Sequence, residues 1–150
     1  MLPAFGTTLV LFLAGLAAGG LSALQAAING RLSLYTGTLN AVLISITVSF
    51  ALVLTVAIAA RSPRGLSLTG VPPYLLLGGV AGLAYVAAMT YLAPRLGVTP
   101  TLVAAIAGQL LAAIVLDHFG FLRDGPIHLN LPRLLAAVLV LVAVPLSRVR

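Results

Sequence analysis

Three side-chain amides lie in segments that are otherwise apolar. Gln25 and Asn29 stand four residues apart in the stretch "ALQAAING", and Gln109 lies in a later apolar segment. On a helix, Gln25 and Asn29 are about 40° apart and share one face with Ser22. Amides donate and accept hydrogen bonds without carrying a charge, and a lipid-facing amide is costly. The pattern predicts either interhelical hydrogen bonds or a polar cavity, and three amides on two helices favour the cavity.

Tyr85, Asp117 and His118 are the remaining candidates. The Tyr85 hydroxyl either lines the same cavity, or its ring packs among small residues. Asp117 is the only acid beside an apolar run. It either binds a proton or a cation, or caps the membrane interface beside Arg123, and its place at the end of the run favours the cap. His118 points about 100° away from Asp117 on a helix, so the two residues form no catalytic pair by adjacency alone.

The sequence does not indicate catalysis or a cofactor. It has no nucleophile elbow, no paired carboxylates and no phosphate-binding loop. It also has no cysteine, which excludes disulfides, iron–sulfur clusters and thiolate zinc sites. His118 and His128 alone are too few ligands to predict a metal site. The eight arginines are scattered singly and form no basic patch, so we expect no nucleic-acid partner.

The composition places most of the chain in lipid. Of 150 residues, 61% are hydrophobic and only 7% are charged, which is more apolar side chain than a soluble domain of this length can hide. The N-terminus lacks the basic n-region of a cleaved signal peptide, so the first apolar run should remain as a membrane helix. The apolar runs are continuous rather than alternating, which favours helices over strands.

Five apolar runs predict an all-α membrane protein with five transmembrane helices in a single domain, residues 1–150. The runs lie near 7–28, 39–60, 73–93, 99–116 and 132–147. The first three have the roughly 20 residues that span a bilayer, whereas the last two are short and must use flanking residues or thin the bilayer.

Glycine and proline mark the expected helix ends. We expect Asn29-Gly30-Arg31 to end the first helix, and Pro94-Arg95-Leu96-Gly97 to end the third. Tyr35, Tyr74 and Tyr91 fall near the ends of runs, where a tyrosine ring suits the headgroup layer. Two rows of glycine predict close helix packing, and their members are Gly15, Gly19 and Gly20, and Gly78, Gly79 and Gly82.

The arginines are balanced across the membrane. Five crossings put Arg61, Arg64, Arg123 and Arg133 on the N-terminal side, and Arg31, Arg95, Arg148 and Arg150 on the other. An excess of positive charge normally sets the orientation, and here there is none. Either one orientation still dominates, or both insert and two inverted copies pair, as in inverted-repeat transporters.

These residues resemble a known family. The segments "GLSALQAAINGRLS" and "GGVAGLAYVAAMTYLAPRLGVTPTLVAAIAGQLLAAIVLDHFG", with the closing helix that carries Arg133, are similar to the short five-helix proteins of the drug/metabolite transporter superfamily, the YdcZ group. The resemblance covers nearly the whole chain. It implies half of a ten-helix inverted-repeat transporter fold, completed by an inverted partner, in which the first four helices enclose the path and the fifth is peripheral.

The small multidrug resistance proteins are similar only at a distance. Their membrane-embedded glutamate, which couples drug to protons, has no counterpart, because this chain contains no Glu. Asp117 is the only carboxylate near the membrane that could replace it.

We therefore expect a bacterial inner-membrane transporter for a small polar or cationic metabolite or drug-like solute, working by alternating access. The predicted substrate site consists of Ser22, Gln25, Asn29, Tyr85 and Gln109, and the possible ion or proton site consists of Asp117 and His118. The partners are the lipid bilayer and an inverted copy or a related five-helix protein. The alternative is a non-transporting scaffold or regulatory subunit whose amides are interhelical clasps. A passive pore is a third option, and an enzyme is the least favoured.

Overall fold

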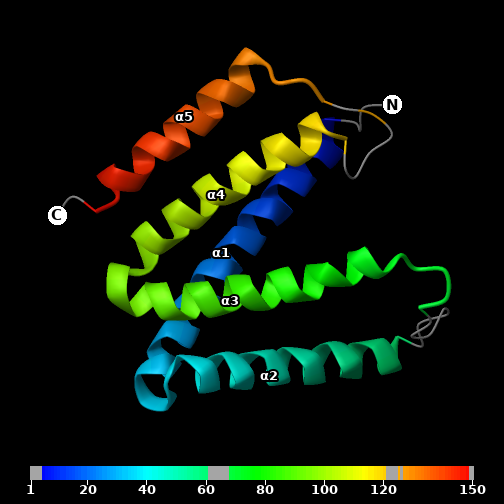
Figure 1. Ribbon diagram of the computed structural model, residues 1–150, viewed down its shortest axis with the longest axis vertical. Helices are drawn as coiled ribbons and strands as arrows, with labels where there is room; N and C mark the ends of the chain where they lie inside the picture. Colours follow the sequence, from blue (N-terminus) through cyan, green and yellow to red (C-terminus); the bar gives the residue numbers. More distant parts are fainter. Residues whose placement is uncertain (1–4, 61–67, 121–124, 126, 149–150) are drawn as a thin grey trace. The chain divides into compact units, whose positions relative to one another are not determined.

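The computed structural model describes residues 5–60, 68–120, 125 and 127–148. These residues form α1 (Phe5–Thr36), α2 (Thr38–Ala59), the 3₁₀ turn η1 (Pro73–Leu76), α3 (Leu77–Leu96), α4 (Val98–His118) and α5 (Leu131–Leu146) (Figure 1). The described part contains no strand, and four of its helices are long and apolar enough to cross a membrane. The predicted all-α membrane fold is confirmed.

The chain forms two compact units. Unit 1 is Met1–Arg95 and unit 2 is Leu96–Arg150. The buried side chains of unit 1 are small or flexible, and they are Ala26, Asn29, Ala41, Val42, Met89, Thr90 and Ala93. Its large apolar side chains instead face outward, for example Phe12 at 72% and Leu16 at 75% exposure. Exposed apolar surface on this scale belongs in the hydrocarbon of a membrane. The few buried side chains lie where the helices pack closely against one another.

The helix α1 is longer than predicted. Its 32 residues span about 48 Å at 1.5 Å per residue, against about 30 Å for a hydrocarbon core. Gly30 does not end the helix. A Cβ at Gly30 would lie 3.2 Å from both Ala93 Cβ and Pro94 Cδ of α3, so this glycine permits a close helix crossing. The expected end at Asn29-Gly30-Arg31 was therefore wrong, because packing and not a turn requires the glycine.

Gly37 separates α1 from α2, and Gly97 precedes α4. Their backbones are nearly the same, with φ 80° and ψ 157° at Gly37, and φ 90° and ψ 155° at Gly97. This region of backbone space is accessible essentially to glycine alone. The carbonyl oxygen of each glycine accepts a backbone hydrogen bond from the first turn of the helix that follows. Gly37 O accepts from Ala41 N at 3.0 Å, and Gly97 O accepts from Thr101 N at 3.3 Å. The helix breaks therefore fall at these two glycines.

The helix α3 ends at Leu96, within the predicted closing segment Pro94-Arg95-Leu96-Gly97. Pro94 lies inside its last turn, and Gly97 follows. A proline can occupy a helix end at the cost of one amide donor, which here is the donor for the Thr90 carbonyl. From the contact between Gly30 and Ala93, α1 and α3 diverge (Figure 1).

The two predicted glycine rows do not bring helices of unit 1 together. A Cβ built at Gly15, Gly19, Gly78 or Gly82 would meet no atom of unit 1 within 4 Å, and the same holds at Gly20 and Gly79. The expected close packing is therefore absent from the described part of unit 1. Gly30, which the sequence reading assigned to a turn, makes the close contact instead.

Unit 2 is the pair α4 and α5. Its α4 has 21 residues and meets the length of a membrane span, whereas α5 has 16. Asn130 caps α5 by accepting a hydrogen bond from Arg133 N at 3.1 Å, and Pro132 occupies the first turn. The predicted shortness of the fifth helix is seen, while the fourth reaches spanning length by including Val98, Asp117 and His118.

Candidate functional site

A small pocket lies between α1 and α3 in unit 1. Its lining residues are Ser22, Gln25, Ala26 and Asn29 of α1, and Tyr85, Val86 and Met89 of α3. On α1, Gln25 and Ala26 lie three and four residues after Ser22, and four and three residues before Asn29, so the four residues form a single stripe. Four of the five residues predicted to contact substrate thus come together at one place.

Two hydroxyls meet across this pocket. Ser22 Oγ lies 3.4 Å from Tyr85 Oη, which is a long and weak hydrogen bond that links α1 to α3. The pocket encloses about 10 Å³, which is room for about one water molecule. This pocket is therefore too small to hold a metabolite.

The two amides of α1 make different contacts. Asn29 is buried, at 6% exposure, and its Nδ2 donates to Ser45 Oγ of α2 at 2.9 Å. Gln25 is exposed and makes no hydrogen bond with any described residue. Asn29 therefore joins α1 to α2 as well as lining the pocket, while Gln25 keeps its full set of donors and acceptors.

Thr90 is a polar residue of this region that the sequence reading missed. It is fully buried in α3, and its hydroxyl has no partner among the described residues. Pro94 has no N–H to donate to the Thr90 carbonyl, so two polar groups lack their usual partners at the crossing of α1 and α3. The sequence does not indicate that the Thr90 hydroxyl lacks a partner, because a threonine hydroxyl in a helix usually bonds to a carbonyl of the same helix.

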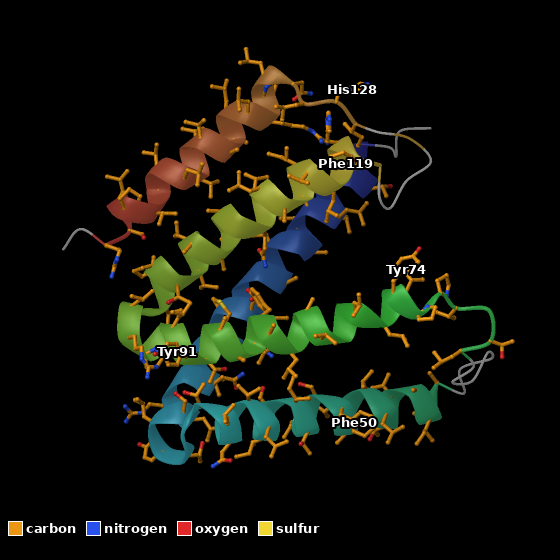
Figure 2. All side chains as sticks on the ribbon, viewed as in Figure 1. Phe50, Tyr74, Tyr91, Phe119 and His128 are labelled. Atoms are coloured by element: carbon orange, nitrogen blue, oxygen red, sulfur yellow. The ribbon has the colours of Figure 1, made fainter. Side chains whose placement is uncertain are left out.

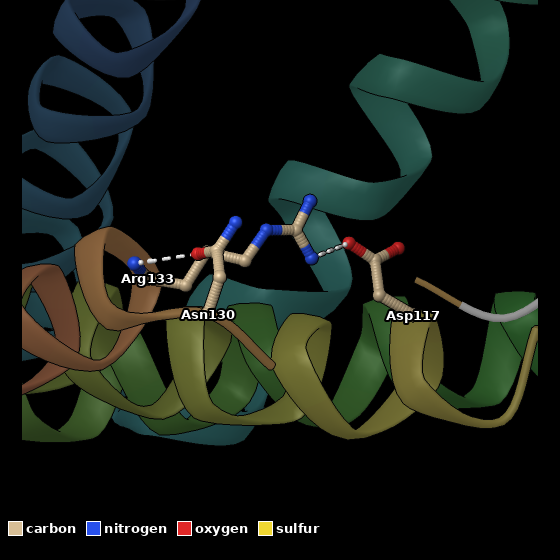
Figure 3. A network of polar contacts seen from close by, with 3 residues as sticks. All are labelled: Asp117, Asn130 and Arg133. Atoms are coloured by element: carbon tan, nitrogen blue, oxygen red, sulfur yellow. Dashed lines mark hydrogen bonds and ion pairs between the residues drawn. The ribbon is translucent and has the colours of Figure 1, made fainter. Parts of the chain in front are cut away.

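Asp117 is held in an ion pair at the end of α4. Its Oδ2 accepts from Arg133 Nη1 of α5 at 2.8 Å, and Figure 3 shows this pair beside the Asn130 cap. The backbone carbonyl of Asp117 also accepts from Ile127 N at 2.8 Å, which ties the returning chain to the end of α4. Arg123, the neighbour expected from sequence, lies outside the described residues. Asp117 and Arg133 are 37% and 34% exposed, so the pair lies at a surface.

His118 and His128 face each other across the same connection. Their ring centroids are 6.2 Å apart, and His118 also contacts Phe119 edge-on at 5.4 Å; Figure 2 labels His128 and Phe119. Among the described residues, no group of three or more His, Cys, Asp or Glu is arranged to hold a metal ion. These histidines therefore belong to the α4–α5 connection in unit 2 and are not among the residues that line the pocket of unit 1.

A family model described as "Putative inner membrane exporter, YdcZ" matches residues 10–146, which is most of the chain. The chain belongs to this YdcZ family. No curated protein and no solved structure matches it.

Membership of the YdcZ family agrees with the resemblance seen in the sequence, and it places the protein in the inner membrane as a member of an exporter family. Membrane lipid and a small-molecule substrate follow from this class. The family description is that of an exporter, which is a kind of transporter.

Gln109 is the one predicted substrate contact of this YdcZ member that does not belong to unit 1. It is exposed on α4, in unit 2, and is not among the residues that line the pocket. Val86, Met89 and Ser45 were missed by sequence reasoning. The first two are apolar and carry no chemical signal, while Ser45 could have been flagged as a hydroxyl within an apolar run.

Proposed function

We propose that this protein exports a small polar or cationic solute along a path that begins at the pocket between α1 and α3. The observation that carries the proposal is the convergence of Ser22, Gln25, Asn29 and Tyr85 on one pocket. Gln25 is the central residue, because an amide without a partner in a membrane helix requires a polar neighbour. A solute passing through the path supplies that neighbour during transport.

The chemistry of the lining favours an uncharged or singly charged solute. The polar groups are amides and hydroxyls, which donate and accept without imposing a permanent charge. An amide oxygen can accept from an ammonium group, and an amide nitrogen can donate to a carbonyl or hydroxyl. The solute class is therefore a small polar or cationic metabolite or a drug-like amine.

The small size of the pocket supports completion of the site by a second half. A cavity of about 10 Å³ cannot hold a metabolite, so the path requires further walls. We assign these walls to Gln109 and α4, and to an inverted second copy or a related five-helix protein. The equal number of arginines on the two predicted membrane sides supports insertion in both orientations. Rocking of the two halves then exposes the site to each side in turn.

Asp117 has a structural role in this proposal. Its carboxylate is engaged by Arg133 at the end of α4, so binding a proton or a cation there would require this pair to separate. We assign the pair to fixing the α4–α5 connection at the membrane interface, with His118 beside it.

A second function is favoured by one observation. The bond from Asn29 to Ser45 is the interhelical clasp expected of a non-transporting scaffold or regulatory subunit. In that case Gln25 would also be a clasp, made to a partner chain, and its loss would weaken assembly rather than transport.

The variant Gln25→Leu separates the two functions. We expect it to abolish export while insertion and dimerisation stay at the level of the native protein. Export is measured in proteoliposomes with a panel of amine and quaternary ammonium solutes, and assembly is measured by cross-linking in membranes.

Asn40→Leu is the matched control. The Asn40 side-chain amide donates to the backbone carbonyl of Thr36, four residues earlier, and does not line the pocket. Full export by Gln25→Leu removes the proposed role of the pocket. Lost assembly with Gln25→Leu, but not with Asn40→Leu, favours the scaffold.

A further inference from the structure

Two arginines of unit 1 are each held over a tyrosine ring of their own helix. On α1, the Arg31 guanidinium carbon lies 5.5 Å from the centre of the Tyr35 ring, and Nη2 donates to Tyr35 Oη at 3.2 Å. On α3, the Arg95 guanidinium carbon lies 3.5 Å from the centre of the Tyr91 ring, and Nη1 donates to Tyr91 O at 2.6 Å. Cation–π contact and these bonds restrict both side chains, which lowers the cost of ordering them on binding.

The two arginine–tyrosine pairs flank one helix crossing. Gly30 contacts Ala93 and Pro94, and the next residue on each helix is the arginine. The backbones of Arg31 and Arg95 are therefore at the same end of unit 1, near the C-terminal ends of α1 and α3. Figure 2 shows Tyr91 at this end of α3.

No internal carboxylate of unit 1 is available to neutralise these charges. Residues 1–95 contain no Asp or Glu, and the two acids of the whole chain are Asp117 and Asp124. Asp117 is paired with Arg133. In the predicted five-crossing topology, both acids belong to the membrane side opposite Arg31 and Arg95. An exposed guanidinium that makes one hydrogen bond retains several of its five donors, which can bind an acceptor from outside the chain.

We propose that Arg31 and Arg95 form a site for the phosphodiester headgroup of an anionic phospholipid. Guanidinium groups bind phosphate oxygens through paired, charge-assisted hydrogen bonds. A lipid is favoured as the source of phosphate because bare apolar surface adjoins Arg31. Leu34, three residues after Arg31 on α1, is 63% exposed, so an acyl chain can lie beside the headgroup site. The tyrosine rings suit the headgroup layer. This site is independent of the exported solute and of the proposed function.

The test compares thermal unfolding of the purified full chain in neutral detergent with three additives: phosphatidylglycerol, phosphatidylcholine and inorganic phosphate. We expect phosphatidylglycerol alone to raise the midpoint. The double variant Arg31→Gln/Arg95→Gln should bind phosphatidylglycerol about twenty-five-fold more weakly, since each arginine near an anionic surface contributes about five-fold. The matched control is Arg61→Gln/Arg64→Gln, which removes the same charge from the other predicted side.

Three results would overturn the proposal. Equal stabilisation by inorganic phosphate would indicate a site for the free anion, and equal stabilisation by phosphatidylcholine would indicate that the charge is not recognised. An equal loss in the Arg61/Arg64 control would indicate diffuse attraction to net charge. If the double variant does not fold, each single variant is measured, and about five-fold weaker binding is expected for each. Unchanged binding by both single variants would also reject the site.

Discussion

In unit 1 the polar side chains that line the pocket are uncharged, whereas in unit 2 the described polar cluster contains an acid and its arginine partner. Ser22, Gln25, Asn29 and Tyr85 lie along the α1–α3 pocket, within helices long enough to span the membrane. Asp117 and Arg133 instead meet where α4 ends and α5 begins. Amides and hydroxyls cost less in a membrane interior than charges, so the interior of unit 1 can keep a polar site.

A second contrast, between a bonded and an unbonded amide, lies within α1. Gln25 and Asn29 share a face and a residue class, yet Asn29 is buried and bonded to Ser45 while Gln25 is exposed and without a partner among the described residues. One amide therefore contributes to assembly of the helices, and the other is available to a solute. Residue type and spacing alone do not separate these two roles.

The largest effect on stability is expected at Gly30. A side chain there would press on Ala93 and Pro94, so Gly30→Val should lower the free energy of unfolding by about 1–3 kcal/mol. The measurement is denaturant unfolding of the purified protein in detergent. Gly19→Val is the control with no expected change, because no atom of unit 1 lies within 4 Å of a Cβ at that position. Equal losses at both glycines would contradict the assignment of the crossing to Gly30.

A smaller effect is expected from Asn29→Leu. Loss of the bond to Ser45 should cost about 0.6–1 kcal/mol, which is typical of hydrogen bonds between membrane helices. A double-mutant cycle with Ser45→Ala should return this value as the coupling energy. Gln25→Leu is the comparison, with no expected loss of stability. If Gln25→Leu proves as destabilising as Asn29→Leu, the distinction between the two amides fails.

The smallest effect is expected from Asp117→Asn. The ion pair with Arg133 is about one-third exposed, so its loss should cost less than about 1 kcal/mol after solvent screening. Export should persist, because the carboxylate is assigned to the helix connection. Unfolding midpoints and proteoliposome export are measured on the same preparation. Abolished export with unchanged stability would instead assign a coupling role to Asp117, and the contrast between the units would no longer hold.

Local patterns predicted the helices and most of the pocket. Continuous apolar runs located all five helices, and the spacing of Ser22, Gln25 and Asn29 placed them on one face, because helical periodicity is a local property. Tyr85 was predicted as an alternative to simple packing, and it does meet Ser22.

The misassigned features depend on contacts between distant residues. Gly30 looks like a helix stop in sequence, but it packs against Ala93 and Pro94 across α1 and α3. The positive φ at Gly37 and Gly97 marks the true breaks, and composition alone does not distinguish these glycines from Gly30. The pairing of Asn29 with Ser45, and of Asp117 with Arg133, likewise depends on how helices pack, which residue spacing does not give.

The central claim is that two oppositely inserted copies build the path. The absence of cysteine allows a direct test, with a single Ser67→Cys substitution in the connection between α2 and α3. Intact cells producing only this chain are labelled with a membrane-impermeant maleimide, and labelling is repeated after permeabilisation. The account predicts that about half of the molecules react before permeabilisation and all react afterwards. Labelling of all or none of the molecules in intact cells would show a single orientation and contradict the inverted homodimer.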